Sequence, residues 1–358
     1  MKYNTCVKIL IYNRTQFGYH IDTYKYVEEL GDEIQFVYAC IDQGRPKIDS
    51  SKAQIAYVTS NKVSKVKRIW HLFAFLIKER RNFDAFFAVY HPGISIISPL
   101  LRSRMILDIR SRNVSEFWLT FRIQNWILKL EAKTARHVTV VSKELADSLG
   151  FDEFTIIPVG VDNVSPTALE SKNEIPPLIL TYLGSFEQHN IPLLVQGFSF
   201  ACRKSSHQLK LFLAGTGPEE ELDKIHRSIQ EACCPKSIEL TGYLNRGNID
   251  LLLRRTHVGI VHIPVDGRYD GQPSTKLFEY WSYGIPVIGS RYDYNEKYID
   301  SSSGFLYEFD SQDLCKVILE MLESYHAFHA ADIALKSKSH LWSAIVRNNL
   351  LPLLNKVG

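Results

Sequence analysis

Short apolar runs alternate with longer stretches of helical period along nearly the whole chain, and this alternation constrains the fold more than any other feature. Strand followed by helix, repeated many times, is typical of a parallel sheet with helices on both faces. In the first half we predict strands at 7–12, 34–41, 85–90, 104–109 and 138–142, and helices at 21–30, 62–80, 116–135 and 143–149.

A second strand–helix series begins near residue 178, after a polar, proline-containing stretch that is typical of a linker. Its predicted strands are 178–183, 209–214, 238–241, 259–263 and 286–289. The fold class is therefore α/β, with two Rossmann-like doubly wound domains facing each other across a cleft. We expect an N-terminal domain over 1–165, a second domain over 166–340, and a C-terminal helix over 341–358 that packs back towards the first domain.

Composition excludes several classes of protein. The chain is 45% hydrophobic and 23% charged, which is typical of a folded globular protein and not of a disordered one. The longest uncharged stretch, 85–101, contains the turn-forming His91-Pro92-Gly93 and would span a bilayer poorly. No secretory signal is recognisable at the N-terminus, so we expect a cytoplasmic protein with free thiols. No cysteine pair, D-x-D triplet or His cluster has metal-ligand spacing, so we expect no metal and no cofactor.

One segment, Asp270 to Ile288, predicts a ligand site. A Gly/Pro turn leads into a helix with Ser274 at the N-cap and Gly284 at C′. The free N–H groups and the dipole at such a helix start favour a diphosphate. Glu279 lies one turn beyond Thr275 on the same face, where its carboxylate could accept hydrogen bonds from both hydroxyls of a ribose. The alternative is a solvated helix residue, but a charge among Leu, Phe, Tyr and Trp needs a partner.

This segment resembles the donor-binding signature of family-4 retaining glycosyltransferases of the GT-B fold, P-x-K-L-F-E-Y-x-x-x-G-x-P-V-I. Supporting pieces occur in the family's order over nearly the whole chain. They are Val140-Val141-Ser142, Ile157-Pro158-Val159-Gly160-Val161-Asp162, Tyr182-Leu183-Gly184-Ser185, Phe212-Leu213-Ala214-Gly215-Thr216-Gly217-Pro218 and Leu240-Thr241-Gly242-Tyr243-Leu244. Each piece alone is weak evidence for the resemblance, whereas all five in the family's order are strong evidence for it.

The resemblance implies a role for particular residues of this chain. Glu279 would bind the nucleotide ribose, and the backbone of Gly242, Tyr243 and Leu244 would meet the base. The sugar and phosphates would lie against Gly271, Gln272, Pro273, Ser274 and Thr275, and Gly184 and Ser185 would border the donor. Gly18 would match the glycine loop after the first strand, and His91 a family histidine near the reacting sugar.

The sequence also departs from the family pattern. The commoner motif has a glutamate eight residues before the one at 279, and here that position is Gly271, with Asp270 one residue out of register. Many relatives carry an Arg and a Lys after the glycine of the Tyr-x-Gly piece, whereas this chain has Ser185 and, further on, His189. A neutral imidazole would be a weak substitute for those cations. We therefore expect Lys276, or an arginine of the first half such as Arg14 or Arg110, to supply the missing positive charge.

The resemblance implies an enzyme that transfers a hexosyl unit from a nucleotide-diphospho-sugar with retention of configuration and without a metal, with His91 orienting the sugar. Two readings stay open beside it: a sugar-nucleotide epimerase of the same fold, and a non-catalytic relative that binds sugars or acts as a scaffold. An NAD-dependent oxidoreductase is disfavoured, because the loop after the first strand lacks G-x-G-x-x-G and has the single glycine Gly18.

Residues 1–160 carry 23 Lys and Arg against 16 Asp and Glu, a net charge of +7, so the first half is expected to meet something anionic. Two basic segments with helical period, 61–81 and 117–129, also carry Trp and Phe. We expect most of their apolar residues to pack on the sheet, while the excess cations favour peripheral contact with the inner face of the cytoplasmic membrane. The expected acceptor is then lipid-linked or a polysaccharide precursor, as in lipopolysaccharide or capsule synthesis, and no nucleic acid partner is expected.

Overall fold

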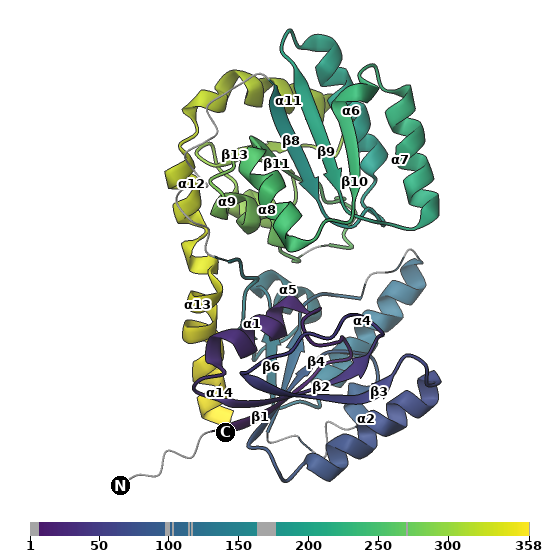
Figure 1. Cartoon of the computed structure of the whole chain (residues 1–358), viewed down its shortest axis with the longest axis vertical. Helices are drawn as coiled ribbons and strands as arrows, with labels where there is room; N and C mark the ends of the chain where they lie inside the picture. Colours follow the sequence, from purple (N-terminus) through teal and green to yellow (C-terminus); the bar gives the residue numbers. More distant parts are fainter. Residues whose placement is uncertain are drawn as a thin grey trace. The chain divides into compact units, whose positions relative to one another are not determined.

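The structure is a computed structural model that describes residues 7–96, 101, 104–113, 115, 117–162, 177–269 and 271–357. The chain divides into two compact units (Figure 1). The first unit consists of residues 1–160 together with 342–358, and the second of residues 161–341. The boundary predicted between residues 165 and 166 lies outside the described residues.

The first unit is built on a seven-stranded parallel sheet with the order β3-β2-β1-β4-β5-β6-β7. Its strands are β1 (Lys8–Tyr12), β2 (Gln35–Asp42), β3 (Ala53–Ser60), β4 (Ala85–Val89), β5 (Met105–Ile109), β6 (His137–Val140) and β7 (Thr155–Ile156). Its helices are α1 (Ile21–Leu30), α2 (Lys65–Glu79), α4 (Trp118–Ala132), α5 (Lys143–Leu149), α13 (Trp342–Ile345) and α14 (Leu351–Val357), with the shorter η1 (Ile94–Ile96) and η6 (Val346–Leu350).

The end of the chain completes the core of the first unit. Residues 342–357 lie along α1 and the sheet (Figure 1). The Trp342 side chain is buried and meets the ring of Tyr26 edge to face. Gly160 allows this packing, because a Cβ there would come within 2.4 Å of the indole. The last sixteen described residues therefore supply core surface that residues 1–160 lack on their own.

The second unit contains a six-stranded parallel sheet with the order β10-β9-β8-β11-β12-β13. Its strands are β8 (Leu178–Leu183), β9 (Leu209–Ala214), β10 (Ile238–Gly242), β11 (Val258–Val261), β12 (Val287–Ser290) and β13 (Gly304–Tyr307). Its helices are α6 (Ile191–Lys204), α7 (Glu219–Glu231), α8 (Arg246–Arg255), α9 (Thr275–Ser282), α10 (Asp293–Tyr298), α11 (Ser311–Ser324) and α12 (Ala330–Lys336), with the short η3 (Pro235–Ser237), η4 (Tyr325–Ala327) and η5 (Lys338–His340).

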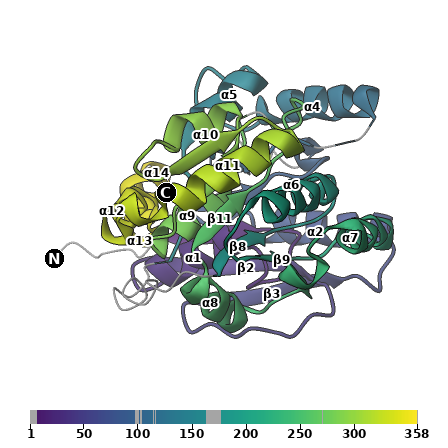
Figure 2. The ribbon, with the colours of Figure 1, turned by 90° about the horizontal axis from the view of Figure 1, so that it is seen from above.

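One large core cluster joins α6, α7 and α11 to one face of the second sheet. Helices α6 and α11 lie side by side (Figure 2), and Gly197 permits their close approach because a Cβ there would meet Leu314 at 2.8 Å. The prediction of two doubly wound parallel sheets is confirmed. Three strands were not predicted: β3 and β13 are edge strands, and β7 has only two residues.

Two helices of the first unit differ from the sequence-based expectation. On α4 the buried positions are Asn125, Leu128, Glu131 and Ala132. The larger apolar residues face outward, and on α2 Val66, Ile69 and Trp70 are exposed as well. The exposed apolar residues of α4 and its start are Phe117, Trp118, Leu119, Ile123, Trp126, Ile127 and Leu130. The expectation that most of these residues pack on the sheet is therefore wrong, because each helix meets its sheet through a narrower stripe than its apolar face. Among the described helices, none is long and apolar enough to cross a membrane.

The packing of Trp342 gives a first prediction. Replacing a buried Trp by Ala removes packing and leaves a cavity, which costs about 3–5 kcal/mol. Trp342→Ala should lower the free energy of unfolding of the first unit by that amount in a urea titration. Trp70→Ala is the control, because this tryptophan is exposed on α2 and should change stability by less than about 0.5 kcal/mol. Equal losses in the two variants would contradict the role of Trp342 in the core.

Candidate functional site

The strand order of the second unit identifies where a ligand can bind. From β8 the chain moves outward to β9 and β10, then returns to place β11 on the other side of β8. The connections after β8 and β11 therefore diverge, and in doubly wound sheets ligands bind at the carboxyl ends of such a pair of strands. The loop of residues 184–190 follows β8, and the loop of residues 262–274 follows β11 and leads into α9. Most of the predicted donor-binding residues lie in these two loops and at the start of α9.

The first of these loops has an unusual backbone. Gly215 lies so close that a Cβ on it would come within 1.7 Å of the Gly184 carbonyl oxygen. Gln188 and Asn190 have φ values of 60° and 51°, a left-handed backbone conformation that residues other than glycine rarely adopt. Such strain persists only where the surroundings hold it, and it is concentrated at functional sites.

Contacts from the second loop hold the first one. The Arg268 guanidinium donates to Gln188 Oε1 at 3.0 Å, and the His189 ring lies 5.3 Å from that of Tyr269. The buried His262 donates from Nε2 to the Asn190 carbonyl at 3.2 Å. The structure thus brings His189 next to the loop that carries Gly271 to Ser274, and Gly184 and Ser185 lie at the start of the same loop as His189.

His262 is held as a neutral ring. Its Nδ1 accepts a hydrogen bond from the Tyr307 hydroxyl, and its face stacks on Phe309 at 4.7 Å between ring centres. Burial lowers the pKa of His262 to about 4. A second proton on this ring would remove the acceptor that Tyr307 uses and would place an uncompensated charge in the core.

Helix α9 begins and ends as the sequence predicts. Ser274 occupies the N-cap position, although its side chain makes no capping hydrogen bond, and Gly284 has the left-handed φ of 64° expected at C′. Tyr280 fixes the rotation of the helix, because its ring lies against Gly259 of β11 and its hydroxyl donates to the Thr181 carbonyl. With Tyr280 packed on the sheet, Glu279 is turned to a neighbouring side of the helix.

Glu279 is buried, and each of its two carboxylate oxygens is paired with a cation. Its side chain is 8% exposed, with Lys276 Nζ 2.6 Å from one oxygen and Arg246 Nη1 2.5 Å from the other. Arg246 begins α8 and also meets Asp162 Oδ2 at 3.2 Å. The interpretation of Glu279 as a solvated helix residue is therefore wrong. Burial alone would raise the pKa of this carboxyl, but Lys276 and Arg246 outweigh it and the pKa is lowered, so Glu279 is charged at neutral pH.

The segment after β10 comes near this cluster through Arg246. Gly242 has φ 70°, and a Cβ there would meet nothing within 4 Å, so its backbone borders open space. Tyr243 is one of the most exposed large side chains of the chain, and Leu244 is half-buried. The backbone of these three residues is thus accessible to a planar ligand, two to four residues before the arginine that binds Glu279.

The loop before α9 offers a further polar group. Gly271 is buried with φ 71° and stands where the commoner motif has its first glutamate. The neighbouring Gln272 has a buried side-chain nitrogen that donates to no partner within the described part of the chain. Asp270 lies outside the described residues. An amide donor without an acceptor, beside the start of α9, fits a ligand that carries hydroxyl or phosphate oxygens.

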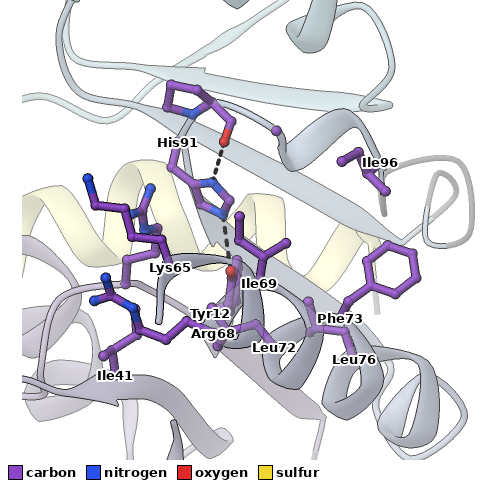
Figure 3. Close-up of a pocket in the computed structure, with 13 residues that line it drawn as sticks. Tyr12, Ile41, Lys65, Arg68, Ile69, Leu72, Phe73, Leu76, His91 and Ile96 are labelled. Carbon is purple, nitrogen blue, oxygen red and sulfur yellow. Dashed lines mark hydrogen bonds between the residues drawn. The ribbon is translucent and has the colours of Figure 1, made fainter. Parts of the chain in front are cut away.

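In the first unit, His91 lies at the carboxyl end of β4, beside the point where the strand order reverses between β1 and β4. Figure 3 shows its ring held by two hydrogen bonds, with Nδ1 donating to the Pro92 carbonyl at 3.0 Å and Nε2 accepting from the Tyr12 hydroxyl at 3.1 Å. Burial lowers the pKa of His91 and nearby Arg14 lowers it further, whereas the Pro92 carbonyl acts in the opposite direction. His91 is therefore a neutral, oriented ring on the wall of a cavity.

Two other first-unit candidates have structural roles. Gly18 has φ 86°, and a Cβ there would lie 2.3 Å from Ile48, so packing and backbone conformation both require the glycine. Arg110 is buried, pairs with Asp22 at 2.8 Å and donates to the Ile157 carbonyl at 2.7 Å. These contacts commit its guanidinium to the interior. Arg14, in contrast, is exposed and lines the cavity beside His91.

Sequence reasoning missed Arg246, Arg268 and Tyr12. Arg246 follows the Gly242–Leu244 piece closely, but only the turn of α8 brings its side chain to a carboxylate 33 residues further on. Arg268 and Tyr12 had no signal in the sequence, since each acts through a loop or strand from a distant part of the chain. Within the described ranges, no group of three or more His, Cys, Asp or Glu side chains is placed to hold a metal ion.

Comparison with known proteins identifies the fold. Residues 177–324, which lie within the second unit, match the model of the family described as glycosyl transferases group 1. Sucrose-phosphate synthase from Thermosynechococcus elongatus superposes with a TM-score of 0.75 at 15% identity, over 98% of this chain and 99% of that one. HepE of Anabaena in complex with UDP superposes with a TM-score of 0.71 at 14% identity, over 98% of this chain and 100% of that one. The pneumococcal O-GlcNAc transferase GtfA in complex with UDP and GlcNAc gives 0.74 at 10%, over 99% of each. No curated protein matches the sequence. The fold is thus the GT-B fold of these structures.

The state of His262 gives a prediction on pH. Because the pKa is about 4 in the folded chain and about 6.5 when unfolded, the unfolded state binds more protons below pH 6.5. Stability should therefore fall as the pH drops from 6.5 towards 4, and His262 alone should account for about 2 kcal/mol between pH 7.5 and 5. His262→Gln should reduce the pH dependence of the free energy of unfolding of the second unit by that amount. The exposed His226→Gln on α7 is the control, and an equal reduction in both variants would refute the prediction.

Proposed function

We propose that this protein is a nucleotide-sugar-dependent glycosyltransferase, because residues 177–324 match the glycosyl transferases group 1 model and the chain has the GT-B fold. It moves a hexosyl unit from a nucleotide-diphospho-sugar to a lipid-linked or polysaccharide-precursor acceptor, with retention of configuration and without a metal. The observation that carries the proposal is the buried carboxylate of Glu279, held between two cations beside the start of α9.

The donor is bound in the second unit. Its ribose hydroxyls donate to Glu279, whose lowered pKa keeps it a strong acceptor. The diphosphate lies at the start of α9, where the helix dipole favours negative charge and the Ser274 side chain makes no capping bond. Lys276 is within reach of both groups, since it contacts Glu279 from the first turn of the same helix. Lys276 and Arg246 then supply the positive charge that relatives obtain from the loop after β8.

The known structures support a nucleotide as the ligand. HepE of Anabaena was solved with UDP, with UDP and glucose, and with UDP-glucose, and GtfA with UDP and GlcNAc. In this chain the open backbone at Gly242 to Leu244 receives the base, and the unpartnered amide of Gln272 donates to the sugar or the phosphates. We therefore use UDP as the probe for the donor site.

Transfer requires one bond exchange. The bond between the anomeric carbon and the donor diphosphate breaks, and the acceptor oxygen bonds to that carbon on the same face. The acceptor proton passes to an oxygen of the departing diphosphate, so no separate base is needed. The charge that develops on the leaving group is met by the N–H groups of α9 and by Lys276, both in place before the reaction. The neutral, oriented His91 ring positions the reacting sugar.

The exposed helices of the first unit support contact with a membrane surface. Trp118, Ile123 and Trp126 point outward from α4, and Trp70 and Ile69 from α2. Cations are interleaved with them, with Arg122 over the Trp118 ring at 4.8 Å. Apolar and aromatic side chains mixed with cations bind the interface of an anionic bilayer. The protein then works at the inner face of the cytoplasmic membrane.

Replacing the carboxylate that would accept hydrogen bonds from the ribose tests the donor site. Glu279→Gln keeps the shape of the side chain but loses the charge-assisted hydrogen bonds, which are worth about 1.5–3 kcal/mol each. UDP affinity measured by calorimetry should fall by roughly a hundredfold, which corresponds to about 3 kcal/mol, with the fold intact by circular dichroism. Glu296→Gln is the matched control, because it also loses a carboxylate paired with an arginine, in the same unit but on the surface. Unchanged UDP affinity in Glu279→Gln would reject the ribose site.

A substitution on α4 tests the membrane surface. Ile123→Asp should weaken binding to vesicles containing anionic lipid by about tenfold or more in a sedimentation assay, since burial of one Ile contributes about 1.5–3 kcal/mol. Leu251→Asp places the same charge on an exposed apolar position of α8 in the second unit and should leave vesicle binding unchanged. Binding of the unmodified protein should also weaken at high salt. Equal effects of the two substitutions would exclude α4 as the contact surface.

A further inference from the structure

Two cavities adjoin in the first unit and differ sharply in character. One has a volume of about 170 Å³ and is walled mainly by apolar side chains of α2. The other has a volume of about 340 Å³, and most of the residues that line it are polar and come from the loops after β1, β2, β3 and β4. They share four lining residues, which are Arg14, Ile41, Arg68 and His91. The two cavities therefore share a wall, and we call them the apolar chamber and the polar chamber of one candidate site.

The apolar chamber opens towards the exposed apolar surface of the same unit. Leu72 and Leu76 of α2 form its buried floor. Ile69 and Ile96 also line it, yet both are more than half exposed. A hydrocarbon chain in this chamber would therefore continue outward over Ile69 onto the face of α2 that carries Trp70, without crossing a polar rim. A chamber meant for a small, fully enclosed apolar molecule would not share its walls with the surface in this way.

Positive charge gathers where the two chambers meet. Arg14 and Arg68 line both chambers, and Lys65 lines the apolar one. Figure 3 shows Lys65 and Arg68 at one end of the cavity and Phe73, Leu76 and Ile96 at the other. Among the described residues, none that lines either chamber is acidic, and the one side-chain bond recorded for Arg68 goes to the neutral Asn61. Arg14, Lys65 and Arg68 thus form a cluster of three cations with no acidic side chain among the described residues that line the chambers, which fits an anionic ligand.

The polar chamber suits hydroxyl groups. Asn13, Thr15, Gln43, Asn61 and His20 supply donors and acceptors to its wall, and Tyr90 adds an aromatic ring. Along the site the wall therefore changes from polar side chains that can bind hydroxyl groups, to cations, to apolar side chains. His91 stands at the junction, where its neutral ring faces both chambers.

We propose that this two-chamber site binds the acceptor, and that the acceptor is an amphiphile in which a phosphate or diphosphate joins a saccharide to a hydrocarbon chain. The hydrocarbon lies in the chamber of Leu72 and Leu76, the phosphate oxygens on Arg14, Lys65 and Arg68, and the saccharide hydroxyls in the polar chamber beside His91. The role of this amphiphile as acceptor rests on the proposed transferase function. An apolar chamber beside the cations favours a lipid-linked acceptor over one without a lipid.

Geranyl diphosphate is a soluble probe that carries both the anion and a ten-carbon apolar chain. Its binding is measured by calorimetry in the absence of any vesicle and with UDP at saturation, so that the phosphate site at α9 is occupied. Inorganic pyrophosphate supplies the anion alone and geraniol the chain alone. The expected result is that geranyl diphosphate binds at least about tenfold more tightly than either fragment. Equal affinity for geranyl diphosphate and pyrophosphate would overturn the proposal.

Matched variants on α2 locate the binding. Arg68→Gln should weaken geranyl diphosphate by about tenfold or more, whereas Lys67→Gln removes the same charge from the neighbouring position and should not, because Lys67 lines neither chamber. Ile69→Asp should likewise weaken it, whereas Val66→Asp should not, since Val66 is similarly exposed on the same helix but lies outside the cavity. Equal effects within either pair would overturn the site, and unchanged melting temperatures exclude unfolding as the cause.

The outcome for this site is separable from that for the donor site. If UDP binds to the unmodified protein and geranyl diphosphate does not, the amphiphile site is wrong while the transferase proposal stands. If geranyl diphosphate binds with the expected dependence on Arg68 while neither UDP nor any nucleotide sugar binds, the ligand class is right and its role as acceptor is wrong.

Discussion

One buried charge organises the candidate site of the second unit. Glu279 stands in a helix whose other side chains, Phe278, Tyr280 and Trp281, are packed into the core. A carboxylate in that position would be strongly destabilising without partners. Lys276 and Arg246 remove the penalty, and in doing so they tie the first turn of α9 to the first turn of α8. The groups that make Glu279 tolerable in the fold are therefore the same groups that a nucleotide diphosphate would use.

This arrangement also accounts for the departures of the sequence from the family pattern. The loop after β8 carries His189, which burial keeps neutral, in place of a cation. Its shape is maintained from the loop after β11, through Arg268 on Gln188 and His262 on Asn190. The cations closest to this part of the second unit lie on α8, on α9 and in the loop after β11.

Much of the fold followed from periodicity alone, because buried parallel strands and the helices between them have strong, local patterns. Strand β3 was missed since it is an edge strand with mixed polar and apolar residues, which look the same in a loop. At the candidate site, the buried position of Glu279 was predictable from its apolar neighbours in sequence. Its partner Arg246 was not, because ion pairs between distant segments have no spacing rule. The outward apolar faces of α2 and α4 were mispredicted for a related reason: amphipathic period shows that a face is apolar but not how much of it the sheet covers.

The last residues of the chain have a consequence for the order in which the units can form during synthesis. Since Trp342 and the helices after it fill the core of the first unit, residues 1–160 remain an incomplete domain until residues 342–357 have been synthesised. The second unit needs only residues 161–341, and it enters and leaves through neighbouring segments, with Val161 bridged to Leu341. The usual N-terminal-first sequence of domain folding on the ribosome is thereby reversed. The second unit can fold while the first unit still lacks residues 342–357.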